Sequence, residues 1–187
     1  CPGVKITFYR EKKDKTDVLF YENGISEFMG SHPNSEEAFA DIFFLGEGAK
    51  KDNGMNFEWG CYFAEASQLN LSYANLIPTI SGGTHVAAFR TGLFEGVKEY
   101  ANLHNLIPKN IQLLVGDVWQ NVNSVISLKM RELQFKGQTK EKLSSKECVS
   151  FITSLVKDSF SLYLNENTER ANVLLETFIT NASKRQR

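Results

Sequence analysis

Cysteine and histidine are scarce in this sequence, with three of each in 187 residues, and neither type is clustered. Cys1, Cys61 and Cys148 lie far apart and form no C-x-x-C pair, which argues against a disulfide framework. The scattered histidines have no accompanying group of carboxylates, so no metal site is expected. Cys61 lies in an alternating strand pattern among aromatic residues, which favours a core position over a nucleophile. His85 has no acid or nucleophile near it in sequence that would indicate a catalytic triad.

Long apolar runs are also missing, as are the glycine motifs of common nucleotide-binding folds. No stretch approaches the roughly 20 apolar residues that a membrane helix needs, and no signal-peptide pattern opens the chain. There is no Walker loop and no dinucleotide-binding glycine pattern. Together with the scattered cysteines, these absences favour a cytoplasmic protein. The chain begins without methionine and runs at once into strand-like sequence, so we expect an internal segment of a larger protein.

Charge is balanced overall but uneven along the chain. The formal net charge is -1 and the pI about 6.4, so the surface as a whole is not suited to nucleic acid. One stretch has six basic residues against two acidic ones. The basic residues are Lys129, Arg131, Lys136, Lys140, Lys142 and Lys146. Such a cluster is either a solvated surface or a contact for a phosphate-bearing ligand, and the composition leaves both open.

Hydrophobic periodicity predicts an α+β fold, in which a small mixed or antiparallel sheet carries helices on one face. A half-buried strand is predicted over 4–9, which forms a hairpin with a second strand over 18–21, and further strands are predicted over 41–45, 56–64, 71–76 and 122–130. Helices are predicted over 24–29, 85–104, 145–163 and 173–179. A polar, glycine-rich loop is expected over 46–54. Side chains are expected to cap the two long helices, Thr84 at the first and a capping box of Ser144 and Glu147 at the second.

Arg90 has an unusual position on the first long helix. Apolar residues recur there at helical spacing, at Val86, Phe89, Leu93, Val97 and Tyr100. Arg90 falls within the same arc, where a guanidinium is unfavourable unless it is paired or opens onto a cavity. Arg90 is therefore either a functional residue or a snorkelling arginine at the edge of the apolar stripe.

The stretch from Phe135 to Leu143 carries the strongest functional signal. Gly137 allows backbone angles closed to other residues, so the chain can turn sharply before Gln138 and Lys140. A lysine offers a compact charge with three donors, which suits a terminal phosphate. Gly-Gln-Thr-Lys by itself is also compatible with a solvated loop. If Lys140 binds a nucleotide phosphate, another domain must hold the base, the ribose and Mg²⁺, so this chain is not expected to be a complete enzyme.

Three blocks of residues occur in order and resemble a known family. They are 75–90, which contains Gly-Gly-Thr-His, then 127–130, and then 134–145, which contains Gln-Thr-Lys. Over essentially all 187 residues the chain is similar to the transducer domain of the ATPase subunit of bacterial type IIA DNA topoisomerases. Residues 117–121 and both ends of the chain are similar to the topoisomerase IV type, because gyrase-type subunits usually carry Arg-Glu-Gly-Leu in that block. Ala88 departs from the family, which often has glycine there, and improves helix propensity.

The resemblance implies a transducer domain over 1–187, with a mixed α+β body over 1–144, a helical segment over 145–187 and a left-handed β-α-β crossover. Gln138 and Lys140 would bind the γ-phosphate of Mg-ATP held by an upstream GHKL-type ATPase domain, with Lys140 as the catalytic residue. Arg90 would face a cavity that holds double-stranded DNA.

The resemblance also implies the partners of an ATP-dependent, nucleoid-associated bacterial enzyme that passes DNA strands. They are a downstream TOPRIM domain that holds catalytic Mg²⁺, the A subunit of topoisomerase IV, which supplies the DNA-cleaving tyrosine, and a second copy of the ATPase subunit in a heterotetramer. Two alternatives stay open: the transducer of a gyrase B subunit, and a non-catalytic module of another GHKL ATPase such as a mismatch-repair protein.

Overall fold

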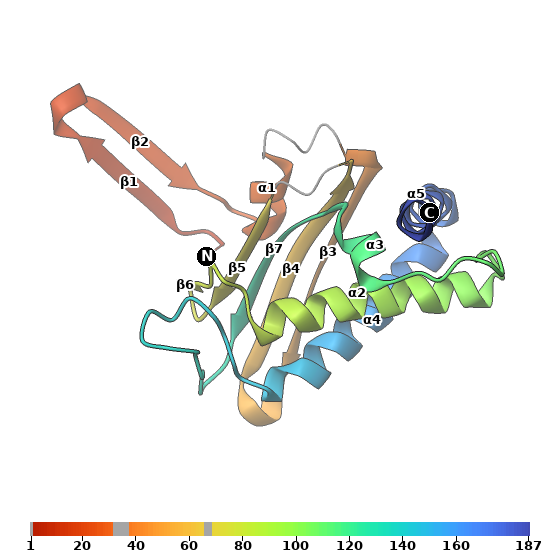
Figure 1. Cartoon of the computed structure of the whole chain (residues 1–187). Coiled ribbons are helices and arrows are strands. Elements are labelled where there is room, and N and C mark those ends of the chain that lie inside the picture. The colour runs from red at the N-terminus through yellow and green to blue at the C-terminus, as the bar shows by residue number, and fades with distance from the viewer. Residues whose placement is uncertain (1, 32–37, 66–68) are drawn as a thin grey trace.

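A five-stranded mixed sheet forms the centre of the computed structural model, which describes residues 2–31, 38–65 and 69–187 (Figure 1). Its strands are β3 (Ala38–Lys50), β4 (Met55–Ala64), β5 (Asn70–Ala74), β6 (Ile77–Pro78) and β7 (Val122–Lys129). They lie in the order β3-β4-β7-β5-β6. All neighbours are antiparallel except β5 and β7, which are parallel. The predicted α+β class is confirmed.

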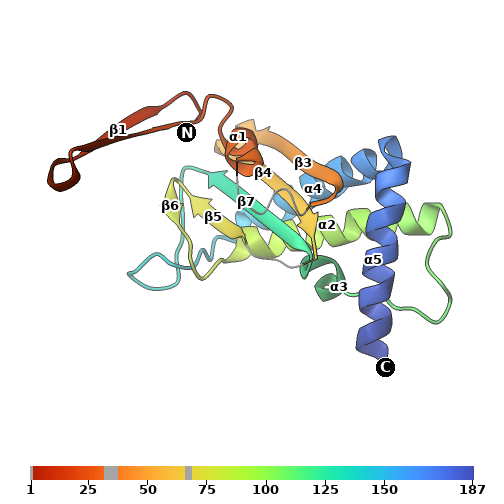
Figure 2. The same cartoon turned by 90° about the horizontal axis from the view of Figure 1, so that it is seen from above.

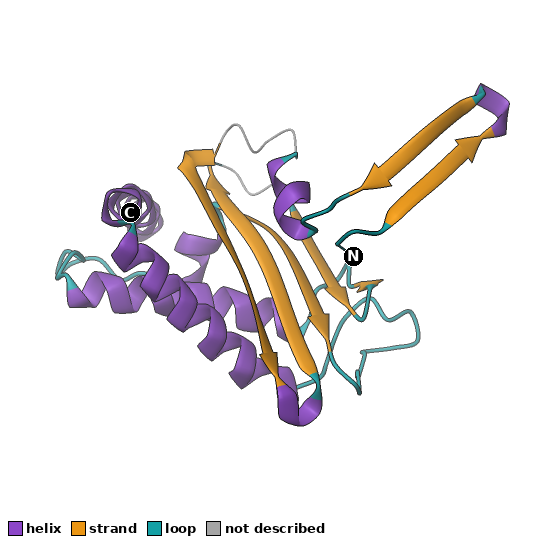
Figure 3. Ribbon diagram, turned by 180° about the vertical axis from the view of Figure 1, so that it is seen from behind, coloured by secondary structure: helices purple, strands orange, loops and turns teal. Residues whose placement is uncertain are grey.

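The parallel pair requires a crossover, and helix α2 (Thr84–Leu103) provides most of it. The chain leaves β5 through β6, follows α2 and the short α3 (Val115–Trp119), and returns as β7 beside β5. In Figure 1 both strands run downward, β7 lies to the right of β5 and α2 lies in front of the sheet; Figure 3 shows the same arrangement from behind. The connection is therefore left-handed, against the strong right-handed preference of such units.

The main core lies between the sheet and the helices α2, α4 (Glu147–Glu166) and α5 (Thr168–Gln186). β4 turns its predicted apolar row to this side, and all four side chains are buried: Phe57, Trp59, Cys61 and Phe63. The opposite face is not bare, because α1 (Ile25–Gly30) buries Met29 there against Tyr62 and Val125. The prediction that all helices share one face is wrong in this respect.

The predicted loop over 46–54 is mostly strand. β3 continues to Lys50, and only a 3-10 turn (Lys51–Asn53) and Gly54 connect it to β4. A Cβ atom at Gly46 would lie 2.3 Å from the Trp59 side chain, and one at Gly48 would lie 2.5 Å from Leu155. These glycines therefore make room for large core side chains inside a strand.

The predicted hairpin forms from β1 (Lys5–Arg10) and β2 (Lys15–Phe20), but it is not half-buried. It extends away from the sheet (Figure 2). Seven large apolar side chains on it are 43% to 56% exposed: Val4, Ile6, Phe8, Tyr9, Val18, Leu19 and Phe20. A two-stranded hairpin is marginally stable alone, and an apolar surface of this kind indicates a contact site.

Both predicted side-chain caps are wrong. α2 begins at Thr84 itself with Gly83 as its N-cap, and α4 begins at Glu147 with Lys146 as its N-cap. Neither N-cap residue makes a side-chain capping hydrogen bond. The hydroxyl of Ser145, next to the predicted cap, instead accepts a hydrogen bond from the backbone N–H of Gln134 at 2.8 Å. That serine stabilises the preceding loop rather than the helix end.

Candidate functional site

The loop between β7 and α4 projects beyond β6 and closes on itself (Figures 1 and 2). Phe135 and Leu143 form an antiparallel bridge, and the N–H of Lys136 donates to the carbonyl oxygen of Lys142 at 2.8 Å. Gln138 and Lys140 lie at the tip between these bonds, and both side chains are exposed. The structure thus brings together the two residues that were expected to bind a phosphate.

Two tip residues have a left-handed backbone. Gly137 has φ 87°, as its expected role in a sharp turn requires, and Lys140 has φ 57°. This region disfavours residues with a Cβ by about 1–2 kcal/mol. Strained backbone of this kind concentrates at functional sites. Four other non-glycine residues in the described ranges share this backbone conformation, Asp14, Asn75, Leu76 and Asn105, so the functional role of Lys140 stays a prediction.

The base of the loop rests on the glycine turn that starts α2. The N–H of Leu143 donates to the Gly82 oxygen at 3.0 Å, and the Leu143 oxygen accepts from the N–H of Thr84 at 3.1 Å. A Cβ atom at Gly83, whose φ is 141°, would lie 2.3 Å from the Leu143 oxygen. The Gly-Gly-Thr-His and Gln-Thr-Lys blocks, about 55 residues apart in sequence, are therefore one structural unit.

His85 supports this unit from inside the protein. Its Nε2 lies 3.1 Å from the hydroxyl of Thr79, whose Oγ1 also donates to the Ser72 oxygen at 2.9 Å. The other ring nitrogen, Nδ1, has no hydrogen-bond partner, and the side chain is fully buried. Burial lowers the pKa of His85 to about 4, so the ring is neutral at pH 7. Its surroundings fit a structural role rather than a catalytic one.

We expect the free energy of unfolding to fall as the pH is lowered from 7 to 4. Between pH 6.5 and about pH 4 the unfolded chain binds a proton at residue 85 that the folded chain does not, so stability rises with pH across this window. A pKa lowered from 6.5 to about 4 corresponds to about 3–4 kcal/mol, since one pKa unit is about 1.4 kcal/mol. Urea unfolding of the wild type and of His85→Gln at pH 7, 5.5 and 4 measures it.

His85→Gln should show a smaller loss of stability between pH 7 and pH 4 than the wild type. His104→Gln is the matched control, because the side chain of His104 is exposed, with its ring against Asn165 and the ring of Tyr100. If His85→Gln and the wild type had the same pH dependence, His85 would not be the group that titrates.

Arg90 lies further along α2 and belongs to a different site. Its side chain is half-buried, and its Cζ atom lies 4.8 Å from the centroid of the Trp119 ring. Burial lowers the pKa of Arg90, but the group stays cationic. Arg90 and Trp119 line a pocket of about 220 Å³ that includes neither Gln138 nor Lys140. The guanidinium thus covers an aromatic ring and also opens onto a pocket, and a functional role of Arg90 stays a prediction.

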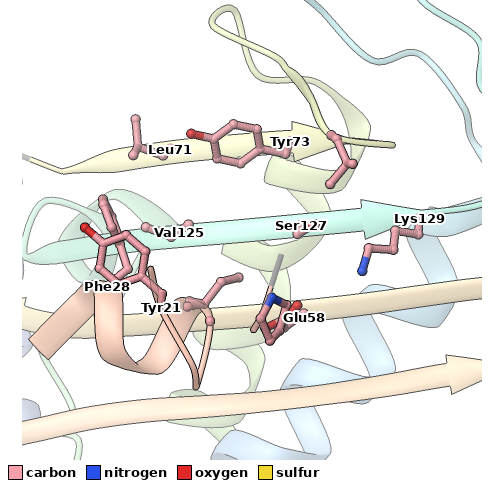
Figure 4. A pocket seen from close by; sticks show the side chains of 12 residues that line it. Tyr21, Phe28, Glu58, Leu71, Tyr73, Val125, Ser127 and Lys129 are labelled. Carbon is pink, nitrogen blue, oxygen red and sulfur yellow. The ribbon is translucent and has the colours of Figure 1, made fainter. Parts of the chain in front are cut away.

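A second pocket, of about 250 Å³, lies on the opposite face of the sheet (Figure 4). Tyr21 and Phe28, packed edge to face with ring centroids 5.6 Å apart, lie at one end, and Lys129 lies toward the other. Neither this pocket nor the role of Trp119 was predicted from the sequence. Their residues come from elements far apart in the chain, so no local pattern marks them.

The two described cysteines belong to the core rather than to a site. Cys61 and Cys148 are buried, and burial raises the pKa of both thiols, so Cys61 is confirmed as a core residue. Over residues 2–31, 38–65 and 69–187, no group of three or more His, Cys, Asp or Glu side chains is arranged to hold a metal ion. Within the same residues, no helix is both long enough and apolar enough to cross a lipid bilayer.

Comparison with known proteins gives consistent results. The family model described as DNA gyrase B matches residues 7–187. The B subunit of DNA topoisomerase 4 from Salmonella typhimurium is 37% identical over 189 residues, which cover 100% of this chain and 30% of that protein. The B subunit of DNA gyrase from Clostridium acetobutylicum is 31% identical, over 98% of this chain and 29% of that protein.

A solved structure, the topoisomerase IV ATP binding domain of Francisella tularensis in complex with a small molecule inhibitor, has the same fold. The TM-score is 0.82 at 29% sequence identity, over 100% of this chain and 50% of that one. The chain spans about 30% of the length of the curated relatives it matches.

Proposed function

The chain belongs to the DNA gyrase B family, and we propose that residues 1–187 are the transducer domain of the ATPase subunit of a type IIA DNA topoisomerase. One observation carries the proposal: the Gln138–Lys140 tip is bonded at its base to the start of α2 and, through Ser145, to the start of α4. A displacement of the tip would therefore reach both long helices. We assign 1–144 to a mixed α+β body and 145–187 to a helical segment that continues from it.

In this proposal Gln138 and Lys140 bind the γ-phosphate of ATP held by an upstream GHKL ATPase domain. Their exposure and the strained backbone of Lys140 support it. In this proposal the upstream domain holds Mg²⁺, since the described residues include no group of three or more His, Cys, Asp or Glu side chains that could hold it. Bound Mg-ATP supplies the phosphoryl group that is transferred to water. The Lys140 ammonium holds the tip at the γ-phosphate and offsets charge there, so ATP favours one domain arrangement more than ADP does.

The exposed hairpin supports an upstream domain that contacts this chain at two places. β1 and β2 carry apolar side chains that the described parts of the chain leave exposed. Figures 1 and 2 show that the hairpin and the loop tip both extend on the β5–β6 side of the sheet. A single domain placed there would cover the hairpin and receive Lys140 at its nucleotide.

We infer the remaining partners from family membership. They are a downstream TOPRIM domain, the A subunit of the topoisomerase, a second copy of the ATPase subunit and double-stranded DNA, which Arg90 would face. Higher identity to the topoisomerase IV relative than to the gyrase relative favours the B subunit of a topoisomerase IV that separates or relaxes DNA, with the B subunit of a gyrase as the alternative. The family match disfavours a mismatch-repair module.

We expect residues 1–187 alone to bind a non-hydrolysable ATP analogue only weakly and not to hydrolyse ATP. One amide and one ammonium supply a small part of the binding free energy of a nucleotide, and the base pocket would lie elsewhere. Calorimetric titration of this chain and of the full-length protein makes the comparison. Micromolar or tighter binding by the 187-residue chain would contradict the assignment. Tight binding by the full-length protein, with weak binding by the 187-residue chain, would support it.

A further inference from the structure

The last turn of α5 is tied to α3 by hydrogen bonds around a buried carboxylate. The side chain of Asp117 is 4% exposed, and its oxygens accept from Nε and Nη2 of Arg185 at 2.9 and 3.0 Å. One of these oxygens also accepts from the backbone N–H of Leu114 at 2.8 Å, which caps α3. Nη2 of Arg185 donates in addition to the Gln112 oxygen at 2.7 Å. Bidentate pairs of this kind are strong and directional, so they fix α3 against α5.

Asn181, one turn earlier on α5, extends this attachment to the sheet. Its Nδ2 donates to the backbone oxygen of Asp117 at 2.9 Å and to Oδ1 of Asn121 at 2.6 Å. Nδ2 of Asn121 donates in turn to the oxygen of Ala64, at the end of β4, at 2.9 Å. Figure 2 shows α3 beside α5, near the ends of β4 and β7. A shift of α5 relative to the sheet would therefore move α3.

Trp119, the last residue of α3, carries the Arg90 guanidinium on its ring. The ring of Phe89 also packs against this indole, edge to face with centroids 6.3 Å apart. A guanidinium is attracted to the face of an indole, and stacking leaves its N–H groups directed outward in their own plane. No carboxylate among the described residues is within ion-pair distance of Arg90, so the ring is the main contact that orients it.

Building on the proposed role of Arg90 toward DNA, we propose that Trp119, Asp117 and Arg185 are positioning residues for Arg90. The Asp117–Arg185 pair holds α3 against the end of α5, and α3 holds the indole under the guanidinium. The direction of Arg90 in its pocket is thereby set by the position of the C-terminal helix. A movement of α5 would then change how Arg90 contacts a DNA phosphate. Binding of DNA at Arg90 would in turn favour one position of α5.

The link is tested first without DNA, by the fluorescence of Trp119 in the 187-residue chain. The chain has two tryptophans, and subtracting the spectrum of Trp119→Phe from that of the wild type isolates the emission of Trp119. Arg90→Gln removes the cation from the ring. The change that it causes in the emission of Trp119 and in its quenching by acrylamide is the reference for the other variants. Arg185→Gln should change both in the same direction, although residue 185 does not touch the ring.

Lys184→Gln is the matched control, because Lys184 is the exposed neighbour of Arg185 and the substitution removes the same charge. It should leave the Trp119 spectrum unchanged. An unaltered spectrum in Arg185→Gln, or an equal change in both variants, would overturn the proposal. The fluorescence measurement does not depend on DNA binding. It therefore tests the link between Arg185 and Trp119 even if the chain is not a transducer domain.

The second arm uses ATP turnover of the full-length protein, titrated with duplex DNA. Trp119→Ala and Arg185→Gln should each raise the DNA concentration for half-maximal stimulation by about threefold to tenfold, the usual size of coupling through intermediate residues. The KM for ATP without DNA should stay unchanged. In the Arg90→Gln background neither change should add a further loss. If the effects of the double variants were the full sum of those of the single variants, the proposal would be overturned. If DNA did not stimulate ATP turnover of the wild type, the proposed role of Arg90 toward DNA would be contradicted instead.

Discussion

Lys140→Ala should lower ATP turnover by about a hundredfold or more in a longer form of the protein that includes the ATP-binding domain. Losses of this size follow when a charge that stabilises a developing phosphoryl charge is removed. The free energy of unfolding of the 187-residue chain should change by no more than about 0.5 kcal/mol. The Lys140 side chain is exposed, and alanine is as strained as lysine in this left-handed backbone conformation. Steady-state turnover and urea unfolding measure the two effects.

Matched variants separate the charge of Lys140 from its backbone. Lys140→Gly relieves the left-handed conformation and should stabilise the chain by about 1 kcal/mol, yet lose as much turnover as Lys140→Ala. Lys140→Arg should not restore full activity, because a planar fork does not replace a point donor. Lys136→Ala and Lys142→Ala, at exposed residues on the same loop, should keep most of the turnover. Near-normal turnover in Lys140→Ala would contradict the role of Lys140 and would indicate that the basic loop is a solvated surface.

Gly83→Ala should lower the free energy of unfolding by about 2–4 kcal/mol and also impair ATP turnover in the full-length protein. The φ of 141° is strained for any residue with a Cβ atom. That atom would also lie 2.3 Å from the Leu143 oxygen, so the backbone at the base of the loop would have to move. Loss of turnover at a temperature where the variant is still folded would show that the glycine turn positions the loop tip.

Gly82→Ala is the control for this prediction. Gly82 has a left-handed φ of 66°, but its nearest neighbour would be a methyl group of Val86 at an ordinary 3.5 Å. We expect Gly82→Ala to lower the free energy of unfolding by about 1 kcal/mol, which is the cost of placing a residue with a Cβ atom in the left-handed region. Equal effects of the two substitutions on stability and turnover would show that contact with Leu143 does not matter.

Local patterns were sufficient to predict most helices and strands. The alternation of β4, the helical stripe of α2 and the division of the C-terminal segment into two helices all appear in the structure, because periodicity reflects which side of an element meets the core. Gly137 was also predicted correctly, since a sharp turn there needs a positive φ. The resemblance of the sequence blocks, rather than their physics, indicated the family that the comparison then confirmed.

Sequence patterns failed where the role of a residue depends on a distant partner. Gly48 looked like a loop residue, but it makes room in a strand for Leu155, which is more than a hundred residues away. Ser144 was predicted to cap α4, but the helix begins at Glu147, and the hydroxyl of the adjacent Ser145 accepts a hydrogen bond from the backbone N–H of Gln134 in the loop. The first hairpin alternated as a half-buried strand would, yet the described parts of this chain leave it exposed.

The sequence by itself determined most of the elements, the apolar faces of β4 and α2 and the residue types at the loop tip, because these depend on neighbours a few positions apart. Only the tertiary structure decided that Gly83 lies against Leu143, that Trp119 lies under Arg90 and that Asp117 binds Arg185. Each of these contacts joins segments that are close only after the crossover has brought α2, α3 and β7 onto the sheet. The geometry of both candidate sites depends on such long-range contacts, and no local spacing records them.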